Sequence, residues 1–188
     1  MGMVLSIAFL GRGGQGIVFA GTVLSEIMFE MGYYVSQLQS YGAEVRGGTV
    51  IAYVVIGREP IENPFIESFD IAVVLHEDPL RRWSSHIKGS RIVIVDGDLV
   101  RTRYENMVEA PLSRRAVENN VYQSLNMVAL GLVLGLGIID ADRDIVDKVL
   151  RKKKNYEVNK RSVEIGYEIA QSIKDTIKEK LYMGKKGQ

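Results

Sequence analysis

An apolar segment of strand length followed by a glycine-rich loop constrains this chain more than any other feature. Residues 4–10 have the composition of a strand buried on both faces, as in a parallel sheet. Four of the next six residues, 11–16, are glycine, so the backbone there can turn sharply and approach a neighbour or ligand closely. Apolar residues then recur at helical spacing over residues 17–31. The stretch predicts a strand, a tight loop and a helix whose free N–H groups point out of the loop.

The rest of the chain continues the alternation of strands and helices. The order predicts an α/β protein, a three-layer α/β/α domain with a parallel or mixed central sheet and a Rossmann-like first βα unit. We expect one domain over residues 1–182 and a disordered tail over 183–188. Further strands are expected at 33–39, 49–56, 70–75 and 91–95, and helices at 79–87, 113–139, 140–153 and 158–182. The loop between the strands at 33–39 and 49–56 could reverse the chain direction.

Three glycines interrupt the apolar helix predicted over residues 113–139. Gly131, Gly135 and Gly137 each cost about 1 kcal/mol relative to alanine in a helix interior. A helix that accepts this cost is expected to pack closely against another element.

Composition excludes several classes of function. A chain of 188 residues with 46% hydrophobic and 25% charged residues has the make-up of a folded domain. The formal net charge of +1 gives no reason to expect nucleic acid as a partner, and we interpret the basic excess after residue 150 as a solvated helix. No apolar run is long enough for a membrane span or signal peptide, so we expect a cytoplasmic protein. Without cysteine, and with only His76 and His86, disulfides, cysteine nucleophiles, cysteine-ligated clusters and zinc sites are disfavoured.

The glycine loop formally satisfies the dinucleotide fingerprint, with Gly11, Gly13 and Gly16 at the required spacing after a strand. That fingerprint also needs an acidic residue at the end of the second strand to hold the ribose. No Asp or Glu occurs between Met31 and Ala43, which weakens the dinucleotide interpretation. A free-standing nucleotide-binding enzyme therefore stays as the alternative function.

A second polar loop with three glycines, residues 40–48, follows the next predicted strand. Parallel strands would bring both loops to the carboxyl edge of the sheet, where α/β proteins bind their ligands. There Arg46 could pair with Glu44, or it could clamp a carboxylate or phosphate. The surface would hold the following polar residues: Arg12, Gln15, Ser40, Tyr41, Glu44 and Arg46.

A thiamine-enzyme metal motif is matched only superficially. Asp96-Gly97-Asp98 with the later Asn119-Asn120 inverts the glycine–aspartate order of the Gly-Asp-Gly…Asn-Asn element and shortens its spacing. We expect Asp96 to end a strand and cap a turn. No metal site is predicted.

Four segments together carry a family resemblance: GRGGQGIVFAGTVLSE, QSYGAEVRGGTV, DIAVVL and QSLNMVALGLVLGL. In this order they resemble the gamma subunit of the 2-oxoacid:ferredoxin oxidoreductases, also found as an internal domain of single-chain pyruvate:ferredoxin oxidoreductases. The family includes pyruvate, 2-oxoglutarate and 2-oxoisovalerate enzymes, and the SYGAEVRGGT form favours the 2-oxoglutarate or related multi-subunit type. The matched loop residues are Gly11, Gly13, Gly14, Gln15 and Gly16, then Ser40, Tyr41, Gly42, Glu44, Arg46, Gly47 and Gly48, and in the late helix Asn126, Met127 and Ala129.

The resemblance implies a subunit of a complex that oxidatively decarboxylates a 2-oxoacid to acyl-coenzyme A and reduces ferredoxin. It implies alpha, beta and delta-type partner subunits, with thiamine diphosphate, Mg²⁺, iron–sulfur clusters and coenzyme A in the complex and none of them bound by this chain alone. The chain itself would have no catalytic residue and would be inactive alone. Our hypothesis is that both glycine loops, with Arg12, dock on the catalytic subunits and help wall the substrate and coenzyme A site. Whether the isolated chain forms a homo-oligomer is left open.

Overall fold

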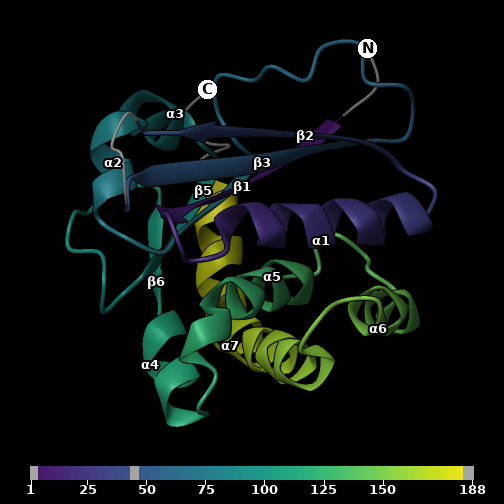
Figure 1. The fold of residues 1–188 in the computed structure, drawn as a ribbon. Coiled ribbons are helices and arrows are strands. Elements are labelled where there is room, and N and C mark those ends of the chain that lie inside the picture. The colour runs from purple at the N-terminus through teal and green to yellow at the C-terminus, as the bar shows by residue number, and fades with distance from the viewer. Residues whose placement is uncertain (1–3, 43–46, 184–188) are drawn as a thin grey trace.

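The computed structural model describes residues 4–42 and 47–183, which form a mixed sheet with helices on both faces (Figure 1). This confirms the predicted three-layer α/β/α class. No helix in the described part of the chain is both long and apolar enough to cross a membrane. The strands are β1 (Val4–Arg12), β2 (Tyr34–Tyr41), β3 (Thr49–Gly57), β4 (Ile71–Val74), β5 (Ile92–Asp96) and β6 (Met107–Ala110). The helices are α1 (Ile17–Glu30), α2 (Asp78–Arg82), α3 (Ser84–Gly89), α4 (Leu112–Glu118), the 3₁₀ turn η1 (Tyr122–Ser124), α5 (Leu125–Gly135), α6 (Arg143–Arg151) and α7 (Tyr156–Met183).

The sheet has six strands in the order β2-β3-β1-β4-β5-β6. β1, β4, β5 and β6 are parallel neighbours, whereas β3 is antiparallel to both β1 and β2. The loop after β2 therefore reverses the chain, and the sheet is mixed. Because β3 is antiparallel to each of its neighbours, β1 and β2 run in the same direction and end at the same edge of the sheet.

Two apolar clusters sandwich the sheet. The larger one joins one face to α1, α5, α6 and α7, through residues such as Phe9, Leu24 and Leu130. The smaller one packs α2 and α3 on the other face, through Leu10 and Trp83. Alternate residues of β1 therefore enter opposite clusters, which is why its sequence is apolar throughout.

Several element boundaries differ from the sequence prediction. Ser40 and Tyr41 belong to β2 rather than to the loop after it. The helix predicted over 79–87 is two short helices, and the one over 113–139 is α4, η1 and α5, with Asn120 at φ 57° after α4. β6 was not predicted. α7 runs one residue into the predicted tail, whose remainder, 184–188, lies outside the described residues.

Close packing of α5 on α7 explains two of the helical glycines. A Cβ on Gly131 would stand 2.1 Å from the Val163 carbonyl oxygen, and one on Gly166 would stand 2.2 Å from the Val128 carbonyl oxygen. The two backbones therefore touch, as the glycine pattern predicted for the α5 helix. Gly137 is different because it lies just after the end of α5 and has a left-handed conformation with φ 70°. It therefore terminates the helix and is not one of the glycines within it.

Ion pairing between α1 and the end of α6 gives a pH-dependent contribution to stability. Glu30 accepts hydrogen bonds from Lys148 at 2.6 Å and Lys152 at 2.9 Å, which lower its pKa from 4.5 to about 2. A carboxylate whose pKa is lower when folded stabilises the protein above its unfolded pKa, and that stabilisation is lost as the pH falls. Between pH 4.5 and about 2, we expect the thermal midpoint of the wild type to fall more steeply than that of Glu30→Gln. If the thermal midpoints of the two proteins fell in parallel over this pH range, the contacts of Glu30 would contribute nothing to stability.

Candidate functional site

The two glycine loops meet at one edge of the sheet, as the sequence predicted. β1 ends at Arg12 directly opposite Thr49, where β3 begins. The Gly13 N–H donates to the Gly48 carbonyl at 2.7 Å, and the Arg12 Nε donates to the Gly47 carbonyl at 3.0 Å. The described parts of both loops therefore form one surface, which we call the glycine edge: residues 11–16, 40–42 and 47–48.

The first loop is held by its own side chains and by α5. The Arg12 N–H donates to Gln15 Oε1 at 2.7 Å, and the Gln15 N–H donates back to the Arg12 carbonyl at 3.1 Å. Gly16 has φ 71°, a left-handed conformation that favours glycine. Its carbonyl accepts a bond from buried Asn126 Nδ2 at 3.0 Å, and a Cβ at Gly16 would stand 2.5 Å from that nitrogen. Asn126 therefore positions the loop from more than a hundred residues away.

Gly13 differs from Gly16 because nothing within the described chain requires it to lack a side chain. Its φ lies outside the left-handed range, and a Cβ there would have its nearest neighbour, the Gly48 carbonyl oxygen, at 3.6 Å, an ordinary contact. Gly13 is also exposed. Its bare backbone thus leaves space on the outer surface of the glycine edge.

One arginine gives this edge its cationic group. Arg12 lies 3.3 Å from Asp78 Oδ2, with both side chains about half exposed. Asp78 is also 3.4 Å from His76 Nδ1. An exposed ion pair of this kind contributes little to stability, so the Arg12 guanidinium can exchange its partner for another anion at small cost.

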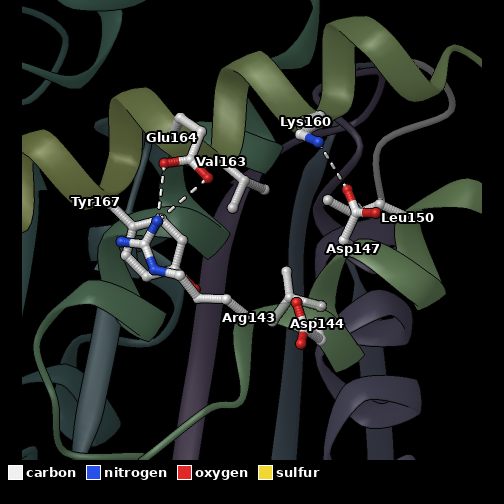
Figure 2. A pocket seen from close by; sticks show the side chains of 9 residues that line it. Arg143, Asp144, Asp147, Leu150, Lys160, Val163, Glu164 and Tyr167 are labelled. Atoms are coloured by element: carbon white, nitrogen blue, oxygen red, sulfur yellow. Dashed lines mark hydrogen bonds and ion pairs between the residues drawn. The ribbon is translucent and has the colours of Figure 1, made fainter.

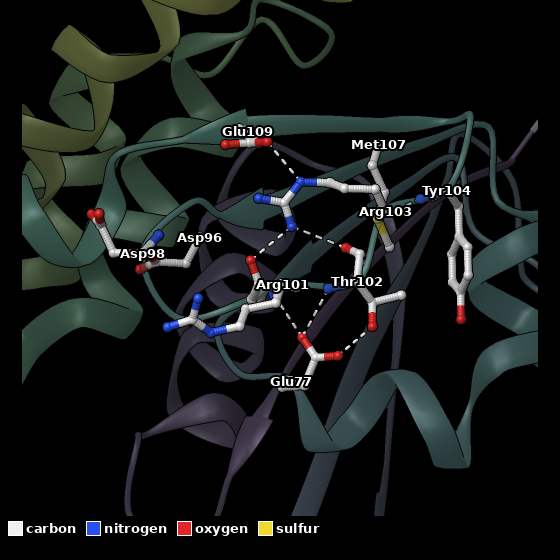
Figure 3. A network of polar contacts seen from close by, with 10 residues as sticks. Glu77, Asp96, Asp98, Arg101, Thr102, Arg103, Tyr104, Met107 and Glu109 are labelled. Atoms are coloured by element: carbon white, nitrogen blue, oxygen red, sulfur yellow. Dashed lines mark hydrogen bonds and ion pairs between the residues drawn. The ribbon is translucent and has the colours of Figure 1, made fainter.

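A second polar network adjoins the carboxyl ends of β4 and β5 (Figure 3). Glu77 accepts from the N–H groups of Arg101 and Thr102, at 2.7 and 3.1 Å, and from the Thr102 hydroxyl. Burial opposes ionisation of Glu77, but these hydrogen bonds outweigh it and lower its pKa. All three bonds to Glu77 come from residues 101 and 102, so we interpret the network as a clamp on the loop after β5.

Asp96 ends β5 and caps a turn, as predicted. Its Oδ1 accepts from the Asp98 N–H at 3.0 Å and the Ser113 hydroxyl at 2.8 Å, and its Oδ2 accepts from the Ser113 N–H at 2.7 Å. Burial raises the pKa of Asp96, although these hydrogen bonds oppose the shift. Both oxygens therefore hold the start of α4. Within residues 4–42 and 47–183, no three His, Asp or Glu side chains gather as a metal site would require.

The remaining predicted site residues are placed as follows. Ser40 and Tyr41 are exposed at the end of β2, and the Gly42 N–H donates to the Thr49 carbonyl at 2.7 Å. No described residue lies within 4 Å of a Cβ built on Gly14, whereas a Cβ on Gly11 would clash with Gln15 and Ile17. Glu44 and Arg46 lie outside the described residues.

The sequence prediction did not include His76, Glu77 and Asp78. These residues follow an apolar strand, and that position indicates the same carboxyl edge of the sheet.

The strand order bears on the dinucleotide alternative. In a dinucleotide site the second strand lies beside the first, so that its terminal acid reaches the ribose. Here β3 separates β1 from β2, and the end of β2 carries Ser40 and Tyr41 instead of an acid. The first βα unit thus follows the Rossmann order of strand, glycine loop and helix along the chain, but β2 does not lie beside β1 as it does in a Rossmann fold.

A cavity of about 260 Å³ lies between α6 and α7 (Figure 2). All of its lining residues belong to these two helices, and none belongs to the glycine edge. Its charges are largely paired internally: Arg143 lies 4.0 Å above the Tyr167 ring and bonds Glu164 at 3.1 Å. Asp147 accepts from Tyr156, Lys160 and Arg151, which lower its pKa. We interpret this cavity as a structural junction between the helices.

Comparison with known proteins places the chain in a family. Residues 6–169 match the model of the pyruvate ferredoxin/flavodoxin oxidoreductase family, and the chain belongs to that family. The 2-oxoglutarate synthase subunit KorC of Archaeoglobus fulgidus is 30% identical over 171 residues, which cover 90% of this chain and 89% of the relative. Other matching relatives are named as subunits of pyruvate and ketoisovalerate oxidoreductases.

Solved structures share the fold. The keto/oxoacid ferredoxin oxidoreductase gamma subunit of Geobacter sulfurreducens has a TM-score of 0.70 and 26% identity, covering 89% of this chain and 99% of that one. The 2-oxoglutarate:ferredoxin oxidoreductase of Magnetococcus marinus, with 2-oxoglutarate, coenzyme A and succinyl-CoA bound, has a TM-score of 0.78 and 24% identity, covering 90% of this chain and 31% of that one. The resemblance to the gamma subunits of 2-oxoacid:ferredoxin oxidoreductases is thereby confirmed.

Proposed function

We propose that this gamma subunit docks its glycine edge on the thiamine-binding subunits of a 2-oxoacid:ferredoxin oxidoreductase and forms part of the wall of the coenzyme A site. The observation that carries the proposal is the bond from Gly13 to Gly48, which joins the two loops into one surface on which the backbone of Gly13, Gly14 and Gly47 is exposed. Backbone free of side chains lets a partner approach closely and offers it polar groups. The bare, exposed Gly13 supports this role, since the described part of its own chain leaves room for a Cβ.

The residues of this chain do not suit the other cofactors of such a complex. An iron–sulfur cluster needs cysteine thiolates, and the chain has none. Asp96, the strongest candidate for an Mg²⁺ ligand, already directs both carboxylate oxygens to Ser113 and Asp98. We propose that thiamine diphosphate, Mg²⁺ and the clusters reside on the alpha, beta and delta-type subunits.

Coenzyme A is the group that the glycine edge fits. Coenzyme A carries phosphates, and Arg12 is a half-exposed guanidinium on this edge whose present partner, Asp78, is itself half exposed. Arginine binds phosphate through paired N–H groups. We propose that Arg12 contacts an anionic group of the bound coenzyme and that no residue of this chain takes part in bond breaking. The names of the relatives favour a 2-oxoglutarate enzyme.

An Arg12→Ala variant, in complex with its partner subunits, tests the contact with coenzyme A. We expect the KM for coenzyme A to rise about tenfold, equivalent to about 1.4 kcal/mol, while the KM for the 2-oxoacid changes little. The matched control is Arg58→Ala at the opposite end of β3, where Arg58 stacks on Tyr33. If Arg12→Ala impaired assembly of the complex but left the KM for coenzyme A unchanged, the glycine edge would serve in docking and not in coenzyme A binding. Turnover by the isolated wild-type chain, or its micromolar binding of NAD, would contradict the proposal itself.

A further inference from the structure

The two outer edges of the sheet are protected very differently. β6, at one edge, is only Met107–Ala110, and its exposed Glu109 is paired with Arg103 at 2.6 Å. Short edge strands and charges are the usual protection against pairing with another chain. β2, at the other edge, runs over Tyr34–Tyr41 as YVSQLQSY, with no charge, no proline and no glycine. Its register with β3 is continuous, without a bulge.

Within residues 4–42 and 47–183, the outer side of β2 is also open. None of its residues is buried, and Tyr34, Gln39, Ser40 and Tyr41 are exposed. Among the described helices and strands, β2 packs substantially only against β3 and α1. A long, neutral, unprotected edge in a folded chain is a template for another strand.

The hydrogen-bond alternation identifies which backbone groups are available. The Gly42 N–H donates to the Thr49 carbonyl, so Gly42 and Thr49 are a hydrogen-bonded pair of the antiparallel ladder. Bonded and non-bonded pairs alternate, and the even-numbered residues of β2 therefore direct their N–H and C=O groups to β3. The odd-numbered residues Val35, Gln37, Gln39 and Tyr41 direct theirs to the open side.

The sequence of β2 is self-complementary about Leu38. Residues 36–40 read SQLQS in both directions, so an antiparallel second copy centred on Leu38 would place Ser opposite Ser and Gln opposite Gln. This register also places odd residues opposite odd residues: Gln37 faces Gln39, and Val35 faces Tyr41. All the outward backbone groups of both strands would then be paired.

A hollow beside β2 suits one side chain of such a second copy. Gln37 contacts Val18 and Thr22 of α1, so the odd residues of β2 lie on the α1 face of the sheet. On that face Phe29, Val35 and Gln37 line a hollow of about 410 Å³, and Phe29 is 74% exposed. Tyr41 of the second copy would stand opposite Val35, where its ring can cover the apolar part of the hollow; Glu26, Glu30 and Lys152 also line it.

We propose that the β2 edge is a self-association surface, on which a second copy of this chain pairs its own β2 antiparallel about a two-fold axis at Leu38. The joined sheet is continuous across both subunits. The interface is isologous, because each subunit offers the same strand. The β2 edge shares Ser40 and Tyr41 with the glycine edge, but the proposal rests on different features: the neutral, self-complementary sequence of β2 and its outward backbone groups.

Disulfide trapping tests the register, because this chain of 188 residues contains no cysteine. In the proposed pair the two copies of Leu38 face each other with Cα atoms about 4.5 Å apart, within disulfide range. Leu38→Cys is therefore expected to give a disulfide-linked dimer on mild oxidation. Tyr34→Cys is the matched control on the same strand face, where the two thiols would be about 27 Å apart. Equal cross-linking of the two variants would overturn the register.

Sedimentation of the unmodified chain tests the association without an introduced cysteine. We expect a species of twice the 21.0 kDa chain mass at micromolar concentration. Gln39→Lys introduces two ammonium groups that are diagonal neighbours across the pair, and we expect it to weaken the dimer at least about tenfold. Gln123→Lys makes the same change on exposed η1 and is expected to leave the dimer intact. A monomeric wild type at 100 μM, or equal weakening by both variants, would overturn the proposal.

Discussion

Replacing Gly13 with phenylalanine is expected to leave the chain folded and to weaken its binding to the partner subunits at least about 100-fold. The substitution is tolerable among the described residues, because the new Cβ would be 3.6 Å from the Gly48 carbonyl oxygen, its nearest neighbour there, and the position is exposed. It is intolerable to a docked partner, because an aromatic ring would fill the space that the partner backbone needs. A loss of about 100-fold corresponds to about 2.8 kcal/mol. Titration of labelled partner subunits with the variant measures the loss.

Two controls separate docking from folding. Gly13→Ala adds one methyl group and is expected to weaken binding less than the phenylalanine variant. Thr176→Phe puts the same ring on the exposed side of α7 and should not change binding. The thermal midpoint of all three variants should stay within about 3 °C of the wild type. Wild-type affinity for Gly13→Phe would mean that the glycine edge faces solvent in the complex.

Gly131→Ala is expected to destabilise the fold by about 3 kcal/mol, although alanine has the higher helix propensity. The added Cβ would lie 2.1 Å from the Val163 carbonyl oxygen. Backbone cannot move aside as a flexible side chain can, so α5 and α7 must separate and lose contact along the larger apolar cluster. Urea unfolding followed by circular dichroism measures the change.

The matched control for this prediction is Gly21→Ala in α1, a helix that packs on the sheet. There the nearest atom to a new Cβ is Gln37 Nε2 at 3.2 Å, at the end of a flexible side chain. The higher helix propensity of alanine and the crowding against Gln37 then oppose each other. We therefore expect the free energy of unfolding to change by no more than about 1 kcal/mol. If Gly131→Ala were as mild as Gly21→Ala, the contact of the two backbones would not be a tight one.

Strong periodicity made most of the fold predictable from the sequence. The apolar β1, the helical spacing of α1 and the glycines of α5 each indicated the correct element and, for α5, its close neighbour. Short or interrupted elements were not predictable in the same way. β6 has only four residues, with one exposed acid, which is too few to show an alternating pattern. The break after α4 depends on Asn120 adopting a left-handed conformation, which asparagine tolerates without requiring it.

The candidate site was predictable where it followed from strand direction, and unpredictable where it depended on distant contacts. The meeting of the two loops follows from two parallel strands ending at one edge. The insertion of β3 between them does not, because nothing local in the sequence states which strand pairs with which. The bond from Asn126 to Gly16 joins residues 110 positions apart, so sequence spacing could not reveal its role.

Hydrogen–deuterium exchange of the assembled complex tests the central claim most directly. Amides become protected when a partner covers them, so the exchange pattern maps the docking surface on the wild-type chain. We predict that residues 11–16 and 47–48 become protected on assembly, while the opposite end of the sheet around Gly57 and Arg58 does not. Unchanged exchange at the glycine edge, with new protection at the opposite end, would contradict the account.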